Sequence, residues 1–234
     1  MFGSVLNQGN MIEVINKDFR DCVIPEGLVI TDPPYNQGYA YNKYKDKISD
    51  DDYIELLSHI PTPCVIIHYP EETINILPKA IKAKCEQVVC WVYNSNTGKQ
   101  SRLISWWGCK PDMSKLKQPY KNLNDIRIMK RIADGKDGAN IYDWWYINQV
   151  KNVSEEKTEH PCQIPMELVY KIIMLTAEEG DLIIDVFAGS GTTGIVAEKL
   201  GLNSVMYDID YEYCRIMEER KRQNLNIFNI GEMK

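Results

Sequence analysis

Residues 181–187 read DLIIDVF, a mainly apolar run without alternation of polar and apolar side chains. A strand with one face in water alternates, whereas a strand covered on both faces need not. Parallel sheets are covered in this way because the helices that connect their strands pack on both faces. The run therefore predicts an α/β fold built around a mostly parallel sheet.

The rest of the chain alternates short apolar runs with segments of helical spacing. Strands are predicted at residues 11–15, 27–31, 64–68, 87–93 and 204–209. Helices are predicted at residues 50–60, 71–84, 165–180, 192–200 and 211–224. Ser49 or Asp50 can cap the first helix, and Pro78 ends or kinks the second. This order of elements indicates a doubly wound sheet.

A glycine-rich turn, AGSGTTG, follows the run at 181–187. Gly189 and Gly191 permit a sharp bend and the close approach of a ligand, and in open parallel sheets ligands bind beyond the strand ends. Asp208 ends the following strand, 17 residues after Gly191, where a carboxylate can accept two hydrogen bonds from ribose hydroxyls. Such a turn can also need glycine for steric reasons alone, and NAD and mononucleotide sites use it too. The chain lacks GxxxxGK[ST], which excludes a P-loop.

A second unusual stretch, Asp32-Pro33-Pro34-Tyr35, follows the predicted strand at 27–31. The proline after Asp32 favours extended backbone there, and the two prolines fix φ over the next two residues. The carboxylate of Asp32 and the carbonyl of Pro33 could accept both hydrogens of an exocyclic amine, while Tyr35 stacks on the ring that bears it. This geometry suits a nucleobase, adenine or cytosine in particular.

Charge is distributed unevenly along the chain. The 27 Lys and Arg and 33 Asp and Glu give a net charge of -6, yet residues 94–151 carry 11 basic and 5 acidic side chains, a net of +6. Such a segment can be a solvated face, and its tryptophans can form a small core. Phosphate contacts are the functional interpretation. The candidate DNA-binding residues are Lys110, Lys115, Lys117, Lys121, Arg127, Lys130 and Arg131.

The stretch at 32–35, followed by DVFAGSGTT at 185–193, resembles the S-adenosylmethionine-dependent DNA amino-methyltransferases in the permuted order of their β group. The matching segments are HPCQIP at 160–165, similar to HPxQKP, MYDID at 206–210, similar to GxEID, and NKD at 16–18, similar to NGD. Ile164, Asp208 and Val186 depart from the usual Lys, Glu and Pro. The resemblance covers nearly the whole chain outside 94–151.

The resemblance implies a permuted, Rossmann-like methyltransferase fold with an inserted target-recognition segment. Residues 1–93 would form the catalytic part and residues 152–234 the cofactor-binding part of one domain. Residues 94–151 would form the basic insertion that reads the target sequence.

The resemblance also implies methyl transfer from S-adenosylmethionine to the N6 amine of adenine in a short sequence of double-stranded DNA. The base would be flipped out of the duplex, and the product would be S-adenosylhomocysteine, with no metal involved. The expected catalytic residues are Asp32, Pro33, Pro34 and Tyr35. The expected cofactor-binding residues are Asp18, Asp32, Pro165, Asp185, Phe187, Gly189, Ser190, Gly191, Thr192, Thr193 and Asp208.

Three alternatives remain open at this point. A cytosine N4 methyltransferase of the same group more often carries Ser in place of Asp32. A non-catalytic subunit that binds S-adenosylmethionine or nucleic acid would not need the stretch at 32–35 intact. An enzyme acting on RNA or on a protein amide is the third. His160 is expected to pack or to begin a helix, and His59 and His68 are given no role.

The cysteines and the hydropathy bound the remaining possibilities. The seven cysteines are scattered, odd in number and without a CxxC pair, which predicts free thiols in a reducing cytoplasm rather than disulfides or a zinc site. No apolar run approaches the roughly 20 residues of a membrane span. These features predict a cytoplasmic protein, and the resemblance implies that the cell is a bacterium or a phage-infected cell and that the enzyme can be a homodimer.

Overall fold

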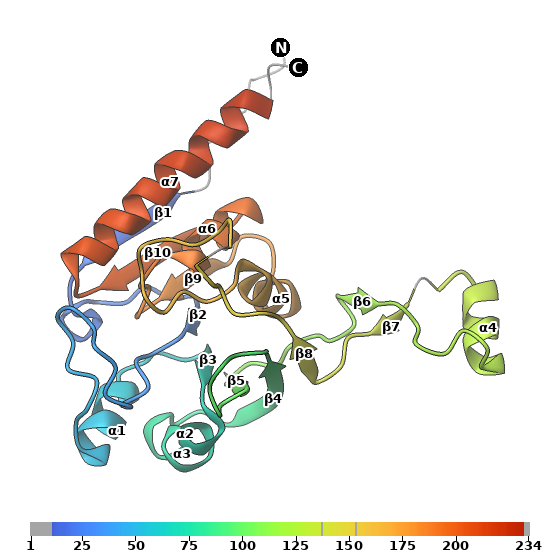
Figure 1. Cartoon of the computed structure of the whole chain (residues 1–234), viewed down its shortest axis with the longest axis horizontal. Coiled ribbons are helices and arrows are strands. Elements are labelled where there is room, and N and C mark those ends of the chain that lie inside the picture. Colours follow the sequence, from blue (N-terminus) through green and yellow to red (C-terminus); the bar gives the residue numbers. More distant parts are fainter. Residues whose placement is uncertain (1–10, 137, 153, 232–234) are drawn as a thin grey trace.

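The computed structural model describes residues 11–136, 138–152 and 154–231. Its centre is an eight-stranded sheet in the order β1-β10-β9-β2-β3-β5-β4-β8 (Figure 1). The strands are β1 (Ile12–Asn16), β2 (Leu28–Thr31), β3 (Cys64–His68), β4 (Cys85–Val92), β5 (Ser101–Trp107), β8 (Trp144–Tyr146), β9 (Leu182–Asp185) and β10 (Asn203–Asp208). Among these described strands only β5 runs antiparallel to its neighbours. The predicted α/β fold with a mostly parallel sheet is confirmed.

Helices cover both faces of this sheet. They are α1 (Asp50–Ser58), α2 (Pro70–Asn75), α3 (Leu77–Ala80), α5 (Met166–Thr176), α6 (Thr192–Lys199) and α7 (Tyr211–Gly231). Alternate residues of β2 enter different cores: Ile30 packs with α5 and α6, whereas Val29 packs with α1 and α3. All residues of β2 are buried, as expected for a strand covered on both sides.

Most predicted elements agree with the structure to within a few residues, and the exceptions have local causes. Ser49 caps α1, with its Oγ accepting from the Asp52 N–H at 3.2 Å. The predicted helix at 71–84 is two short helices, because Pro78 lies in the first turn of α3. The predicted helix at 165–180 ends at Thr176, where Ala177 turns to extended backbone.

The neighbours β2 and β9 diverge to opposite faces of the sheet. After β2 the chain enters α1 on one face, and after β9 it enters α6 on the other. A crevice opens at the carboxyl ends of two such strands. Asp32 and Gly189 follow these two strands, so the fold brings together two stretches that lie far apart in the sequence.

The basic segment at 94–151 divides into two parts. Its β5 and β8 pair within the central sheet, β5 between β3 and β4 and β8 on the outer edge of β4. Between them β6 (Lys117–Gln118) and β7 (Ala139–Asn140) form a small ladder that carries α4 (Ile126–Ala133) away from the body (Figure 1). We call residues 117–140 the arm. The part of the predicted insertion that protrudes is therefore shorter than 94–151.

Candidate active site

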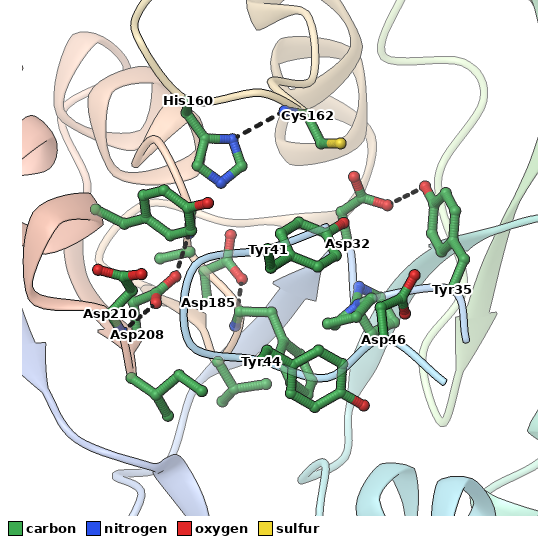
Figure 2. A pocket seen from close by; sticks show the side chains of 18 of the residues that line it. Asp32, Tyr35, Tyr41, Tyr44, Asp46, His160, Cys162, Asp185, Asp208 and Asp210 are labelled. Atoms are coloured by element: carbon green, nitrogen blue, oxygen red, sulfur yellow. Dashed lines mark hydrogen bonds between the residues drawn. The ribbon is translucent and has the colours of Figure 1, made fainter. Parts of the chain in front are cut away.

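A cavity of about 280 Å³ lies at the carboxyl ends of β2 and β9. Its wall includes all of Asp32–Tyr35 and most of the glycine turn, which the sequence analysis singled out separately. Figure 2 shows Asp32 and Tyr35 on one side of this space and Asp208 and Asp210 on the other. The two stretches therefore meet in one site, as predicted.

One buried carboxylate ties the two halves of the cavity together. Asp185, at the end of β9, accepts from the Thr31 hydroxyl at 2.7 Å and from the Phe187 N–H at 3.1 Å through Oδ1. Its Oδ2 accepts from the Thr193 hydroxyl at 2.7 Å. Burial raises the pKa of Asp185, while these hydroxyl donors oppose the rise. Because Thr31 precedes Asp32, this carboxylate fixes the catalytic stretch relative to the cofactor turn.

One of the two carboxylate oxygens of Asp32 accepts a hydrogen bond from the described residues. The hydroxyl of Tyr35 donates to its Oδ1, a bond drawn in Figure 2. Its Oδ2 accepts no hydrogen bond from the described residues and lies 4.0 Å from Nη1 of Arg102. Burial raises the pKa of Asp32 to about 6, although Arg102 and the Tyr35 hydroxyl pull it down and Asp185 adds to the rise. Near neutral pH this site therefore presents an ionised, partly free acceptor.

The backbone after Asp32 is fixed by a chain of hydrogen bonds through His68. The Tyr69 N–H donates to Nδ1 of His68 at 2.8 Å, so Nε2 carries the proton and donates to the Tyr53 hydroxyl at 2.6 Å. The Tyr53 hydroxyl donates in turn to the carbonyl of Pro34. Burial, with Arg102 and Lys99 nearby, lowers the pKa of His68 to about 3, so the ring stays neutral. This chain occupies the Pro34 carbonyl, while the Pro33 carbonyl accepts no hydrogen bond from the described residues.

The loop after Tyr35 folds back over the cavity. The buried carboxylate of Asp46 accepts from the backbone N–H groups of Asn36 at 2.7 Å, Gln37 at 3.3 Å and Tyr39 at 2.9 Å. Asn36 has a left-handed backbone with φ 57°, which Asn tolerates better than most residues. The loop thereby adds Tyr39, Tyr41 and Tyr44 to the cavity wall.

The glycines of the cofactor turn are required by both backbone and packing. Gly189 and Gly191 have φ of 51° and 74°, a region that disfavours other residues. A Cβ on Gly189 would lie 2.9 Å from Nε2 of His160, and one on Gly191 would lie 2.6 Å from Cγ of Met217. The steric explanation considered for this turn therefore holds, and it coexists with a place in the cavity wall for Gly189.

Acidic side chains dominate the side of the cavity near β10. Asp208 accepts from the Gly189 N–H at 2.9 Å and from the Asp210 N–H at 2.8 Å, which leaves lone pairs free on each oxygen. Burial raises the pKa of Asp208 to about 6 against these backbone donors. The Oδ2 of Asp210 is buried and has no hydrogen-bond partner among the described residues. These acceptors, beside the ring of Phe187, fit a ligand with hydroxyl or amine donors and a flat apolar part.

The structure places nine of the eleven predicted cofactor residues in the cavity wall, which does not include Pro165 or Gly191. Pro165 is the N-cap of α5, and Gly191 is the N-cap of α6. Asp18 lines the wall while pairing with Arg20 at 2.6 Å, and the hydrogen bonds from Arg20 lower the pKa of that carboxyl. The contacts of these residues with a cofactor remain predictions.

The predicted DNA-binding residues lie outside the cavity. Lys117, Lys121, Arg127, Lys130 and Arg131 belong to the arm. Lys121 lies 4.9 Å from the ring centroid of Trp144, and Arg127 is paired with Asp125 at 2.8 Å. Lys110 and Lys115 lie nearer the body, where Lys115 bonds to Glu178 at 2.8 Å and to the carbonyl of Ala177.

Several site residues escaped the sequence analysis. Arg102 lies on β5 inside the segment expected to be an insertion, so nothing in the pattern placed it beside Asp32. Arg220, on α7, donates to the Ser190 carbonyl at 2.7 Å and the Thr192 hydroxyl at 3.1 Å, which holds the cofactor turn. His68 was given no role, yet its ring lies 4.7 Å from that of Tyr35. His160 packs on Tyr213 at 4.3 Å, consistent with the predicted packing role.

Searches for other kinds of site give limited findings. Within the described residues, no three His, Cys, Asp or Glu side chains gather as metal ligands would. All seven cysteines are free thiols. In the part of the chain that the structure describes, no helix combines the length and apolar character of a membrane span.

Comparison with known proteins gives several related sequences. M.HpaI, a Type II methyltransferase of Haemophilus parainfluenzae, is 28% identical over 225 residues, which is 86% of this chain and 70% of that protein. The DNA adenine methyltransferase YhdJ of Escherichia coli is 25% identical over 218 residues, 81% of this chain and 74% of its own. Other relatives match over shorter stretches, with 40% and 39% of their length covered.

Solved structures share the fold. The complex of M1.HpyAVI with SAM superposes with a TM-score of 0.54 at 21% identity, over 90% of this chain and 100% of that one. The cytosine-N4-specific PvuII DNA methyltransferase reaches 0.63 at 16% identity, over 93% of this chain and 91% of its own. The sequence also matches the N6/N4 DNA methylase family over residues 27–219. With its two defining stretches joined in one cavity, the chain belongs to this family of DNA methylases.

Proposed function

We propose that the protein transfers a methyl group from S-adenosylmethionine to the N6 amine of adenine in a short DNA sequence, with the base flipped out of the duplex. The observation that carries this proposal is the shared cavity, whose wall contains both Asp32 and most of the glycine turn after β9. A binding protein would need the turn alone, whereas a transferase needs both sides of this space.

The cofactor half of the cavity fits S-adenosylmethionine. Asp208 has free lone pairs for the two ribose hydroxyls, and the orphaned Oδ2 of Asp210 is an acceptor for a further donor. Phe187 supplies a ring beside this position, supported by the ring of Phe19 at 5.2 Å. When bound, S-adenosylmethionine supplies a methyl group on a positively charged sulfur, and S-adenosylhomocysteine is the product.

The residues of β2 and its loop prepare the amine. Its lone pair is delocalised into the base, so it is a poor nucleophile. Hydrogen bonds from the amine to Asp32 and to the free Pro33 carbonyl would favour a pyramidal nitrogen with a directed lone pair. Correct alignment lowers the barrier further, and the Asp185 bridge between the two loops maintains that alignment.

Flipping the base costs a few kcal/mol. Stacking on Tyr35 would return roughly 1–3 kcal/mol of this cost. The ring of Tyr35 is positioned by tilted contacts with the rings of His68 and Tyr69, each at 4.7 Å between centroids. Its present hydrogen bond to Asp32 would be exchanged for the bond from the amine.

Asp32 favours adenine over cytosine as the target base. The cytosine N4 enzymes of this group more often carry Ser at this position, and the relative YhdJ is named a DNA adenine methyltransferase. The shared fold does not separate the two, since the PvuII enzyme is cytosine-specific. The intact residues at 32–35 argue against a non-catalytic subunit, and the family favours DNA over RNA or protein.

The arm is the candidate for target recognition. Its exposed cations would contact phosphates, which supply affinity, and neighbouring side chains would read base edges in a groove. In this proposal residues 1–93 and 152–234, together with β5 and β8, form one methyltransferase domain. A cytoplasmic location and a homodimer are further parts of the proposal, since they suit an enzyme of this class.

The decisive experiment incubates the protein with labelled S-adenosylmethionine and unmethylated DNA and identifies the modified base by mass spectrometry. N6-methyladenine is the expected product, and Asp32→Ala should abolish it. N4-methylcytosine would move the target to cytosine. Label found only in RNA or protein would overturn the DNA assignment, and cofactor binding without any transfer would indicate a non-catalytic subunit.

A further inference from the structure

Arg102 is a buried cation in the wall of the cavity. It projects from β5, and its guanidinium carbon lies 4.8 Å from the ring centroid of Tyr35 and 5.1 Å from that of Trp91. The rings of Tyr69 and Tyr93 lie slightly further away, at 5.6 and 5.7 Å. Its side chain is 14% exposed. Four aromatic rings therefore hold a planar cation at a fixed place beside Asp32.

One donor of Arg102 has no acceptor in the part of the chain that the structure describes. A guanidinium has five N–H donors, and the Nε of Arg102 is buried without such an acceptor, although the guanidinium also interacts with the side chains of Tyr93 and Asp32. Its nearest carboxylate oxygen, Oδ2 of Asp32, is 4.0 Å from Nη1, too far for a hydrogen bond. Burying an unsatisfied charged donor is costly, so a position of this kind indicates a partner that arrives with the substrate.

The nearby Lys99 differs in each of these respects. Its Nζ lies 4.1 Å from the centroid of Tyr69, on one of the same rings, but its side chain is 39% exposed. It already has a carboxylate partner, Glu71, at 3.3 Å. Lys99 is therefore a surface cation bonded to a carboxylate, whereas Arg102 lies inside the site with a buried Nε that has no acceptor among the described residues.

We infer that Arg102 reads the base, by donating to the ring nitrogen next to the amine that Asp32 accepts, which is N1 of adenine. This inference rests on the proposed function. An acceptor beside a donor complements the Watson–Crick edge of adenine or cytosine, where an amine adjoins an unprotonated ring nitrogen. Guanine and thymine present a carbonyl beside an N–H. Asp32 would then meet a carbonyl oxygen and Arg102 would meet an N–H, and neither contact forms a hydrogen bond, so these bases are rejected.

The alternative is that Arg102 only supports the rings of Tyr35 and Trp91. A supporting role predicts that loss of Arg102 slows every substrate equally. A role in reading N1 predicts that loss of Arg102 slows methylation only of bases that carry N1. Substituting single atoms of the base therefore separates the two roles.

The test uses duplexes of the protein's own target sequence, identified from DNA it has methylated, in which the target adenine is replaced by 1-deazaadenine or 7-deazaadenine. Single-turnover methylation is measured for the natural protein, Arg102→Met and the control Lys99→Gln. Removal of N1 should slow the natural protein and Lys99→Gln about 10- to 100-fold more than it slows Arg102→Met. Removal of N7 should affect all three alike.

The outcomes separate this inference from the proposed function. No methylation of adenine in natural DNA would overturn both. Methylation of natural DNA, with the same loss on removing N1 in Arg102→Met as in the natural protein, would overturn the role of Arg102 alone, as would selective dependence on N7. If Arg102→Met fails to fold or to bind S-adenosylmethionine, the natural protein still decides: equal rates with 1-deazaadenine and 7-deazaadenine would overturn the inference.

Discussion

In the cavity Asp185 is 3% exposed and accepts three hydrogen bonds, whereas on the arm Ile126 is 82% exposed and packs in no core. The same contrast holds more widely. Polar groups around the cavity are buried and mostly partnered, while α4 exposes Ile126, Met129 and Ile132 beside its cations, with Leu123 exposed just before the helix. Burial holds the side chains of the cavity in one arrangement, whereas the exposed side chains of the arm can rearrange around a partner. The two regions should therefore respond differently to substitution.

The largest difference in the free energy of unfolding is expected between substitutions of two aspartates, one in the cavity and one on the arm. Asp185→Ala would leave two hydroxyls and a backbone N–H without their acceptor, and we expect it to lower the free energy of unfolding by about 3 kcal/mol or more. Asp134→Ala, at the exposed end of α4, should change it by less than about 0.5 kcal/mol. Urea denaturation measures both. Equal effects would contradict the contrast between cavity and arm.

The pH dependence of activity tests the cavity alone. Burial raises the pKa of Asp32 to about 6, so its carboxylate becomes protonated, and a weaker acceptor for the amine, as the pH falls through that value. We expect kcat/KM to rise with pH and to be about tenfold lower at pH 5 than at pH 8. DNA binding measured at both pH values controls for the arm. A profile that is flat down to pH 4.5 would contradict an essential Asp32 carboxylate with this raised pKa.

Substitutions of two glycines separate the cost of a left-handed backbone from the cost of a steric clash with neighbouring side chains. Gly191 in the cofactor turn and Gly135 on the arm have similar φ, 74° and 76°. A Cβ on Gly191 would lie 2.6 Å from Met217, whereas one on Gly135 meets nothing within 4 Å. Alanine at either position should cost about 1–2 kcal/mol for the left-handed backbone, and Gly191→Ala should cost more because Met217 must move. Thermal unfolding of the two variants would show similar shifts if packing around the turn were loose.

The smallest effect on the fold is expected from the cations of α4. Replacing Arg127, Lys130 and Arg131 together by Ala should leave stability and cofactor affinity almost unchanged, because these side chains are exposed. The triple substitution should weaken DNA binding at every sequence. It should also reduce the steepness with which the logarithm of the binding constant falls with the logarithm of the salt concentration, by up to about 3. Binding isotherms at several salt concentrations measure this. An unchanged slope would remove α4 from the phosphate contacts.

The sequence allowed prediction of the part of the site built on local patterns. Strand β9, the glycine turn and the start of α6 follow from an apolar run, two glycines and helical spacing, and each lies where it was expected. The stretch at 32–35 was equally visible, since two prolines restrict the backbone whatever surrounds them. Their meeting in one cavity was expected from the resemblance, because no order of strands was predicted from the sequence.

Contacts between distant segments were not predictable in this way. Arg102 reaches Asp32 only because β5 enters the sheet antiparallel beside β3, and nothing in the local sequence indicates that pairing. Arg220 reaches the cofactor turn from α7, 30 residues after Ser190. The boundary of the protruding segment was also hidden, because the tryptophans of β5 and β8 lie in the same stretch of sequence as the cations of the arm. Such features depend on which elements pack together, and one sequence does not encode that locally.

The hydrogen bonds of Asp185 have a consequence for engineering. An exchange of the stretch around Asp32 with that of a relative would preserve the site only if a hydroxyl remained at position 31, because Asp185 holds both Thr31 and Thr193. A chimera that brought a valine there would keep every residue at 32–35 and still lose the link to the other loop. An exchange between relatives should therefore move both loops together with the Asp185 carboxylate that links them.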